Sequence, residues 1–172
     1  MNQRAHNAIV ALLDEKQIQY VVIVHEPSKT SDESKAVRAS AGYPNTEGAK
    51  ALLTKLYFVD SEKFATIVLP GSHVLDKEKL LALIPSLKKM RFVTPEEMNT
   101  LAGVVPGCMP PFATPIFPDV PLLIIASALS TFDHIGFNAA YLEKSILLSA
   151  EEYLSAIIPS HVVDCSVPKK GK

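Results

Sequence analysis

The sequence contains little that would hold a metal ion. Its two cysteines, Cys108 and Cys165, are far apart, and the chain has no C-x-x-C or closely spaced Cys/His pattern. The five histidines are scattered, and no H-E-x-x-H pair occurs among them. Structural zinc sites usually show such spacings. We therefore expect no structural zinc site, and we predict neither a metal nor another cofactor.

Long hydrophobic runs are also absent. The best candidate, residues 120–129, contains Pro121 and Ser127 and is too short to span a bilayer. The first residues lead directly into an amphipathic pattern, without the hydrophobic region and cleavage site of a secretory signal. We therefore expect no membrane partner and a cytoplasmic location.

The chain carries almost no excess charge of either sign. Its formal net charge is −1 over 172 residues. Proteins that bind nucleic acid over a large surface are usually strongly basic. This balance argues against DNA as a partner, but it allows an enzyme that holds only the end of an RNA. Among the local basic clusters, residues 88–91 are a better candidate for a phosphate contact than the terminal lysines.

The composition is that of a globular protein, with 48% hydrophobic and 20% charged residues. Apolar spacing and capping signals predict helices at 5–16, 30–41, 77–84, 94–101 and 149–158. Runs rich in β-branched and apolar residues predict strands at 20–25, 50–59, 64–70, 88–93, 122–126 and 145–148. Residues 132–138 stay unassigned.

Strands and short helices alternate irregularly, without the regular βαβ units of a parallel sheet. This order predicts a single α+β domain, with a mixed curved or partly closed β-sheet flanked by helices. The domain covers residues 1–165, and residues 166–172 form a flexible basic tail.

Two segments have unusual chemistry. Lys50 lies at the head of an otherwise apolar strand, where an ammonium needs a partner. Gly107 lies in the proline-rich segment 105–112, and glycine lets backbone approach a ligand closely. We expect the two segments to face each other. The alternatives are a surface lysine that reaches water and a rigid connecting loop. Lys55 is a rival cation, but its odd offset from Lys50 places it on the opposite face of the strand.

Several motifs occur in an order that resembles a known family. They are HEPSKTSDES (25–34), GAKALL (48–53), VLPG (68–71), LDKEKL (75–80), TPEE (94–97) and PGCMPPF (106–112). Through these motifs the chain resembles the YbaK family of aminoacyl-tRNA deacylases, which is similar to the editing domain inserted in bacterial prolyl-tRNA synthetases. The resemblance covers nearly the whole chain.

The resemblance implies hydrolysis of the ester between a wrongly attached amino acid and the 3′ end of a tRNA. It implies Lys50 and Gly107 as the catalytic core, without a metal or an enzyme-bound intermediate. It also implies that the terminal ribose hydroxyl helps to activate the attacking water. The expected partner is the 3′ end of a mischarged tRNA, and an aminoacyl-tRNA synthetase is a second candidate.

Further residues are candidates for substrate binding, and most have a structural alternative. His25 is as well explained by core packing as by pocket lining. Thr30 and Ser31 are also suited to cap a helix. Cys108 is better explained by packing, because no histidine is paired with it. The candidates are His25, Thr30, Ser31, Cys108, Phe112 and Asn138.

Asn138 stands where related members carry His or Asn beside small residues, so it is a candidate for reading the amino group of the substrate. Ala140 replaces a glycine common in the family, and the 106–107 pair is Pro-Gly rather than Gly-Gly. These departures leave the amino acid open among Ala, Cys, Ser and Thr.

The predicted function is therefore a trans-editing hydrolase that deacylates mischarged aminoacyl-tRNA by attack of water. The main alternative is a non-catalytic module of the same fold that binds tRNA or a synthetase. A metal-dependent hydrolase is a third reading, with little support from the residues.

Overall fold

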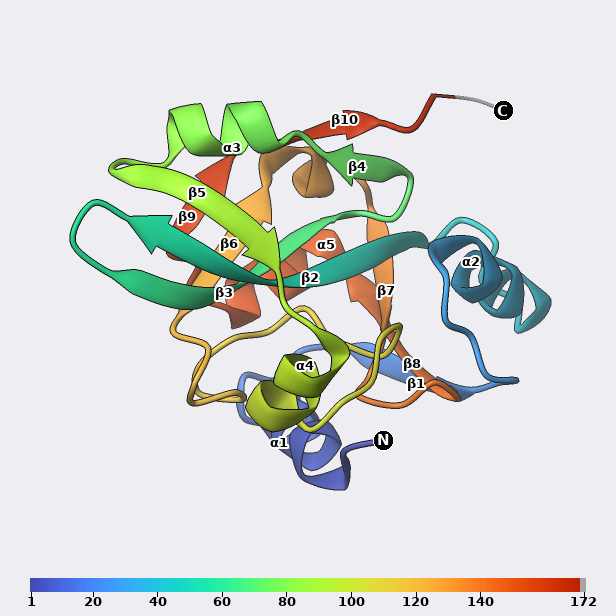
Figure 1. Ribbon diagram of the computed structural model, residues 1–172. Helices are drawn as coiled ribbons and strands as arrows, with labels where there is room; N and C mark the ends of the chain where they lie inside the picture. Colours follow the sequence, from blue (N-terminus) through green and yellow to red (C-terminus); the bar gives the residue numbers. More distant parts are fainter. Residues whose placement is uncertain (171–172) are drawn as a thin grey trace.

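The computed structural model describes residues 1–170, and its elements are shown in Figure 1. The helices are α1 (Gln3–Glu15), α2 (Ser31–Ser40), α3 (Lys77–Leu83), α4 (Pro95–Ala102) and α5 (Ala150–Ala156), with the 3-10 helix η1 (Ser127–Thr131). The strands are β1 (Tyr20–Val24), β2 (Glu47–Phe58), β3 (Glu62–Pro70), β4 (His73–Leu75), β5 (Leu87–Phe92), β6 (Leu122–Ala126), β7 (His134–Asn138), β8 (Lys144–Ser149), β9 (His161–Val163) and β10 (Ser166–Pro168).

One mixed sheet organises the molecule. Its strand order is β1-β8-β7-β2-β3-β6-β9, and β5 pairs with β2 beside this path. The pairs β2–β7, β3–β6 and β6–β9 are parallel, and the other pairs of this sheet are antiparallel. Helices lie on both sides of the sheet in Figure 1. The predicted single α+β domain, with a mixed sheet flanked by helices, is confirmed.

The long strand β2 separates two hydrophobic cores. Its odd-numbered residues Ala49 and Leu53 pack into the larger core, and Leu56 packs into the smaller one. Successive side chains of a strand point to opposite faces, so this alternation places one core on each face. Complete burial of a leucine contributes about 1.5–3 kcal/mol. Both faces of β2 are therefore held in place by packing.

The neighbours of β2 leave part of one edge open. On that edge β7 pairs with Glu47 and Gly48, whereas β5 pairs with residues 54–58. Between these pairings, residues 49–53 have no strand beside them on this edge within the described chain. The gap between β5 and β7 leaves the backbone of residues 49–53 unpaired on this edge, next to side chains from both faces of β2. Lys50, the predicted catalytic lysine, lies in this stretch.

The C-terminal segment differs from the predicted flexible tail 166–172. Residues 166–168 form β10, which pairs antiparallel with β4, and Ser166 is only 5% exposed. The Ser166 hydroxyl oxygen also lies 3.0 Å from Nδ1 of His73. Strands of this length have too few residues for a visible alternation, so β4, β9 and β10 were not predicted. Residues 171 and 172 lie outside the described part of the chain.

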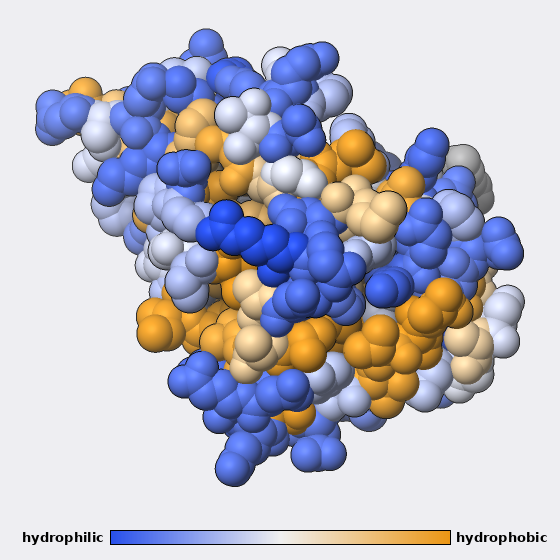
Figure 2. All heavy atoms as spheres, turned by 90° about the horizontal axis from the view of Figure 1, so that it is seen from below, coloured by the Kyte–Doolittle hydropathy of each residue, from blue (hydrophilic) through white to orange (hydrophobic). Residues whose placement is uncertain are grey.

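The surface is mixed in character. On the face that carries α1 and α4, hydrophilic side chains alternate with hydrophobic patches over short distances (Figure 2). None of the helices in residues 1–170 is both long enough and apolar enough to cross a bilayer.

Candidate active site

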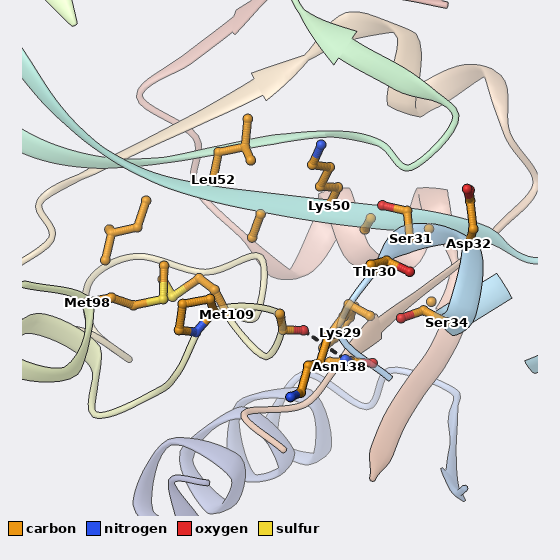
Figure 3. A pocket seen from close by; sticks show the side chains of 18 of the residues that line it. Lys29, Thr30, Ser31, Asp32, Ser34, Lys50, Leu52, Met98, Met109 and Asn138 are labelled. Carbon is orange, nitrogen blue, oxygen red and sulfur yellow. Dashed lines mark hydrogen bonds between the residues drawn. The ribbon is translucent and has the colours of Figure 1, made fainter. Parts of the chain in front are cut away.

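A cleft of about 470 Å³ opens at the unpaired edge of β2. The start of α2, the ends of β5 and β7, the loop after α4 and Lys169 contribute to its walls, and Figure 3 shows side chains that line it. Its lining residues are Lys29, Thr30, Ser31, Asp32, Ser34, Arg38, Gly48, Ala49, Lys50, Ala51, Leu52, Leu53, Phe92, Val93, Met98, Pro106, Gly107, Met109, Gly136, Phe137, Asn138 and Lys169.

Lys50 is a half-buried cation in this cleft. It forms no ion pair with any residue of the described chain. Burial lowers the pKa of its ammonium, and the nearby charge of Lys169 lowers this pKa further. Both effects disfavour the charged form. An anionic ligand would relieve them, so Lys50 is suited to hold negative charge.

Gly107 occupies a position that only glycine fills without strain. Its φ is +95°, and an added Cβ would lie 2.8 Å from both Cα and O of Lys29. Left-handed backbone and close approach both require a residue without a side chain. The loop after α4 is thereby packed directly against the segment that leads into α2.

Asn138 joins these two backbone segments. Its Nδ2 donates to the carbonyl oxygens of Gly107 (2.9 Å) and Ser28 (3.0 Å), and its Oδ1 accepts from the Ser145 hydroxyl (3.3 Å). Asn138 is 7% exposed. Its N–H groups are taken up by these two carbonyls, so Asn138 holds the Gly107 loop to the segment before α2. Asn138 also lines the cleft, and contact of its Oδ1 with the substrate amino group stays a prediction.

The Gly107 loop offers backbone N–H groups to a ligand. The Cys108 N–H donates to Val105 O at 3.2 Å, whereas the N–H of Gly107 has no partner among residues 1–170. A backbone N–H that is not used by the fold can stabilise a negative oxygen during acyl transfer. Within this loop the N–H of Gly107 is thus free to donate in the described chain, whereas that of Cys108 is not.

Lys50 and the Gly107 loop do not face each other directly. Ala49 and Leu53 pack in the core that contains Met109, while Leu52, which shares its face with Lys50, packs against the other core. In Figure 3, Lys50 and Leu52 leave β2 on one side, and Met109 and Asn138 lie on the other side. Lys50 and Gly107 still line the same cleft, which therefore has a side that carries Lys50 and a side that carries the Gly107 loop.

The sequence that forms this cleft matches the model of a known protein family. The model of the aminoacyl-tRNA editing domain family matches residues 25–156, which include the whole cleft except Lys169. The chain belongs to the aminoacyl-tRNA editing domain family. The resemblance to YbaK-type deacylases is thereby confirmed, and the comparisons with individual proteins agree with it.

A curated relative of this editing domain is the multifunctional Ser/Thr-tRNA deacylase ProXp-y of Escherichia coli strain K12. The two sequences are 29% identical over 157 residues, which are 91% of this chain and 90% of the relative. The chains therefore correspond over almost their full lengths.

Solved structures share the fold of this editing domain. A hypothetical protein designated APE2540 has a TM-score of 0.74 at 19% identity, covering 92% of this chain and 99% of the other. A candidate trans-editing enzyme for prolyl-tRNA synthetase has a TM-score of 0.71 at 16% identity, covering 97% and 99%. At these identities the likeness describes the fold alone.

Some predicted substrate-binding residues of the editing domain lie outside the cleft. Cys108 is fully buried, its Sγ donates to Val105 O, and burial raises the pKa of its thiol. Phe112 is 2% exposed and packs edge-on against Phe137 and Tyr153. Both predictions of substrate contact are corrected to core packing, because apolar neighbours surround these side chains.

His25 is also outside the cleft lining. Its Nδ1 lies 2.7 Å from Glu26 O, and its Nε2 lies 2.7 Å from Oγ of Ser145. Ser145 in turn contacts Asn138. His25 is thus the outer end of a hydrogen-bond chain that leads to the Gly107 loop, and its contact with the site is indirect.

Thr30 and Ser31 do line the cleft, at the start of α2. Thr30 forms a capping box with Glu33, in which its hydroxyl oxygen accepts from the Glu33 N–H at 3.2 Å. Hydrogen bonds from the N–H groups of Lys29 and Thr30 lower the pKa of the Glu33 carboxyl. The cap fixes where α2 begins and which residues meet the cleft.

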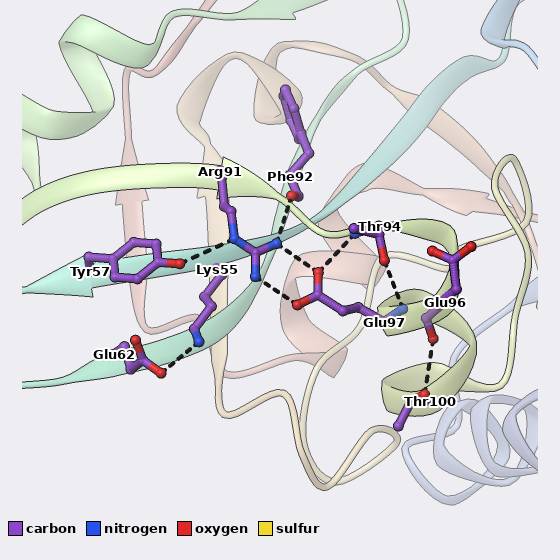
Figure 4. A network of polar contacts seen from close by, with 9 residues as sticks. All are labelled: Lys55, Tyr57, Glu62, Arg91, Phe92, Thr94, Glu96, Glu97 and Thr100. Atoms are coloured by element: carbon purple, nitrogen blue, oxygen red, sulfur yellow. Dashed lines mark hydrogen bonds and ion pairs between the residues drawn. The ribbon is translucent and has the colours of Figure 1, made fainter.

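Two basic residues outside the cleft are held by carboxylates (Figure 4). Lys55 pairs with Glu62 at 2.6 Å, and Arg91 pairs with Glu97 through two bonds of 2.7 Å. Lys55 therefore has a structural partner, consistent with its position on the other face of β2. The structure does not support the phosphate contact that was expected of residues 88–91, because the cleft lining begins only at the next residue of β5, Phe92.

Arg38 and Lys169 are cleft residues that sequence reasoning missed. The polar sequence of α2 predicts that Arg38 is exposed, and no residue of the helix indicates that it is buried. Lys169 was assigned to the flexible tail, whereas the β10–β4 pairing and the hydrogen bond from its own N–H to Ser72 O bring it to the cleft. Within residues 1–170, no group of His, Cys, Asp and Glu side chains is arranged to hold a metal ion.

Proposed function

We propose that this protein is a trans-editing hydrolase that removes wrongly attached amino acids from tRNA. The observation that carries the proposal is a cleft in which, among residues 1–170, the Lys50 ammonium on one side forms no ion pair and the Gly107 N–H on the other donates no hydrogen bond. An aminoacyl ester needs these two features, because it combines a reactive carbonyl with a polyanionic leaving group. Membership of the editing family supports the same reaction.

The chemistry needs no strong nucleophile in the protein. The ester of an amino acid with a ribose hydroxyl is already activated, so positioning and oxyanion stabilisation suffice. Water adds to the carbonyl carbon, and the Gly107 N–H donates to the developing oxyanion. The bond between this carbon and the ribose oxygen then breaks, the ribose oxygen takes up the proton that the attacking water gives up, and the free amino acid leaves. The neighbouring ribose hydroxyl orients the water.

Lys50 holds the nucleotide part of the substrate in this proposal. Its side chain leaves β2 on the face away from the Gly107 loop. That position suits contact with the ribose or phosphate rather than with the ester carbonyl. A lysine ammonium is a point charge with rotatable donors, which is adequate for such binding.

The removed amino acid is serine or threonine. The name of the Escherichia coli relative indicates these two, and the cleft combines small walls at Ala49 and Ala51 with hydroxyls at Thr30 and Ser34. Small side chains fit such walls, and a hydroxyl finds polar partners. Alanine and cysteine esters lack a hydroxyl, so we expect them to react more slowly.

The test is a deacylation panel with tRNAs charged with Ser, Thr, Ala or Cys, at enzyme concentrations far below substrate. Repeated turnover on the Ser and Thr esters is expected. Binding without turnover would instead identify the non-catalytic module. Lys50→Ala should lower kcat/KM by at least about tenfold, since a charge-assisted contact with the substrate is lost, with an unchanged circular dichroism spectrum.

Lys55→Ala is the matched control, because Lys55 lies on the same strand but pairs with Glu62 outside the cleft. It should retain the kcat/KM of the parent protein. Full activity of Lys50→Ala, or an equal loss in both variants, would contradict the proposed site.

A further inference from the structure

Arg38 is a charged residue inside the wall of the cleft. It extends from α2, is 1% exposed and belongs to the cleft lining. Two glycines, which are paired in the parallel register of β2 and β7, make room for it. A Cβ on Gly48 would lie 3.3 Å from Arg38 Nη2, and a Cβ on Gly136 would lie 2.8 Å from Arg38 Cδ.

The guanidinium of Arg38 has no partner within residues 1–170. No hydrogen bond or ion pair holds it there, and its Nε is both buried and unsatisfied. The charge of Glu47 favours the cation, but Glu47 Oε1 already accepts from the N–H groups of Gly48 (3.1 Å) and Ser72 (2.9 Å). Burial lowers the pKa of Arg38.

Such an arrangement is costly for a folded protein. A buried charge is normally paired, and an arginine cannot escape the cost by losing its proton. Hydrophobic residues of similar volume often replace buried ions without loss of stability. The fold alone therefore does not account for an arginine at position 38, and an anion that enters the cleft would.

The charges around Arg38 also favour an anion. The cleft is lined by the cations Lys29, Arg38, Lys50 and Lys169 and by one acidic residue, Asp32. The Asp32 carboxylate is 94% exposed and lies 3.9 Å from Lys169 Nζ. The chain as a whole has a formal charge of −1, so positive charge is concentrated here.

Arg38 and Lys50 lie on the same face of β2. Gly48 and Lys50 are two residues apart, which places their side-chain directions on one face. Arg38 Nη2 fills the space above Gly48. The guanidinium and the ammonium therefore both line the cleft on the face away from the Gly107 loop. Guanidinium groups match phosphate oxygens with two parallel donors.

We propose that Arg38 and Lys50 form a phosphate-binding subsite that holds the phosphodiester on the 5′ side of the terminal adenosine of the substrate. The inference rests on the proposed deacylation and assigns a ligand to a residue that the reaction itself does not need. Arg38 is thus a binding residue, and it acts on KM rather than on the chemical step.

Two small substrates test this assignment. The first is adenosine that carries serine on its ribose, and the second is the same compound with a 5′-phosphate methyl ester. The parent protein should hydrolyse the phosphate-containing compound with a lower KM. Arg38→Gln should raise this KM at least about tenfold, since a charge-assisted hydrogen bond is lost. Its KM for the phosphate-free compound should equal that of the parent.

Two further variants complete the comparison. Arg38→Lys keeps the charge without the planar fork, so it should retain part of the preference for the phosphate-containing compound. Lys88→Gln removes an exposed cation of β5 outside the cleft and should change neither KM. If Arg38→Gln is unstable, the Arg38→Lys comparison carries the test alone. Equal losses on both compounds, or no loss on either, would overturn the subsite.

Failure of the proposed function gives a different result. If the parent protein hydrolyses neither compound, the phosphate subsite is tested by thermal unfolding with inorganic phosphate. Phosphate should raise the Tm of the parent and of Lys88→Gln, because it binds only the folded state. It should not raise the Tm of Arg38→Gln. A Tm that rises equally in the parent and Arg38→Gln, or in neither, would refute the assignment.

Discussion

Asn138 links the two backbone segments that shape the loop side of the cleft. Its amide donates to carbonyls of Ser28 and Gly107, which come from parts of the chain that are far apart in sequence. Gly107 cannot move away from Lys29 or gain a side chain without disturbing this contact. The position of one N–H group therefore depends on a single buried amide.

Asn138→Asp tests this dependence. At neutral pH the carboxylate has no donor and places negative charge against two carbonyl oxygens. We expect a loss of about 2–4 kcal/mol in the free energy of unfolding and a kcat that is lower by at least about tenfold. Urea unfolding and single-turnover deacylation at pH 7 measure the two effects.

The matched control is Asn99→Asp, at an exposed position of α4. It makes the same chemical change where water replaces the lost contacts, so stability and kcat should stay close to the parent values. An Asn138→Asp protein with parent-like kcat would mean that the Gly107 loop is positioned by other contacts.

At the scale of single residues, the sequence predicted a role in the site for those residues that differ clearly from their neighbours along the chain. Lys50 stands out against an apolar strand, and Gly107 stands out between prolines. Arg38 does not stand out, because it is buried by glycines in β2 and β7 rather than by its own helix. Asn138 was predicted as a cleft residue, but its hydrogen bonds to Ser28 and Gly107 were not predicted, since no sequence pattern marks these carbonyls as its partners.

At the scale of elements, the junction of β5 and α4 determines where Met98 meets the cleft. Thr94 and Glu97 form a capping box at the start of α4, and Glu97 also accepts two hydrogen bonds from Arg91 of β5. The Thr94-Pro95-Glu96-Glu97 signature made the helix start predictable. The tie to Arg91 was not predictable, because it depends on how β5 ends beside α4.

Glu97→Gln tests the tie between β5 and α4 through its pH dependence. The hydrogen bonds from Arg91 and from the Thr94 N–H lower the pKa of Glu97 from 4.5 to about 2. A lowered carboxyl pKa stabilises the folded state above the unfolded value and loses this effect as pH falls through the folded value. The Tm of the parent should therefore exceed that of Glu97→Gln above about pH 5.

The difference between the two Tm values should shrink as pH falls from 4.5 to about 2, the window set by the Glu97 pKa. Thermal unfolding from pH 2 to pH 7 provides the measurement. Glu96→Gln is a suitable comparison, since Glu96 lies in the same turn of α4 but forms no ion pair with Arg91. Its pKa is lowered only by hydrogen bonds within that turn, so the pH dependence of its Tm difference should be the smaller one. A difference that stays constant over this pH range would contradict the assignment to the Glu97 charge.

At the scale of the whole molecule, the cleft exists because one edge of β2 has no neighbouring strand along residues 49–53 of the described chain. β2 was recognisable from its apolar run, but its partners β5 and β7 come from later in the chain and from different sides of the cleft. Local patterns show that a strand exists, whereas they do not show which of its edges stays free. The place of the cleft therefore follows from topology.

The C-terminal segment closes the cleft from another part of the chain. β10 pairs with β4, and the Lys169 N–H donates to Ser72 O at 2.9 Å, which fixes the lysine beside Lys50. Deletion of residues 166–172 should lower the free energy of unfolding by roughly 1–2 kcal/mol, because the β10–β4 contacts are lost. It should also raise the KM for charged tRNA, because a cation leaves the cleft.

Lys169→Gln in the full chain separates the two effects. It keeps β10 in place and removes only a charge that is 38% exposed, so its unfolding free energy should match the parent value. Its KM should rise about threefold, which is typical of a partly screened contact. Urea unfolding and steady-state deacylation at 0.15 M salt measure the pair. If the deletion changes neither quantity, the segment is the dispensable tail that the sequence alone suggested, and the cationic side of the cleft consists of Arg38 and Lys50 without it.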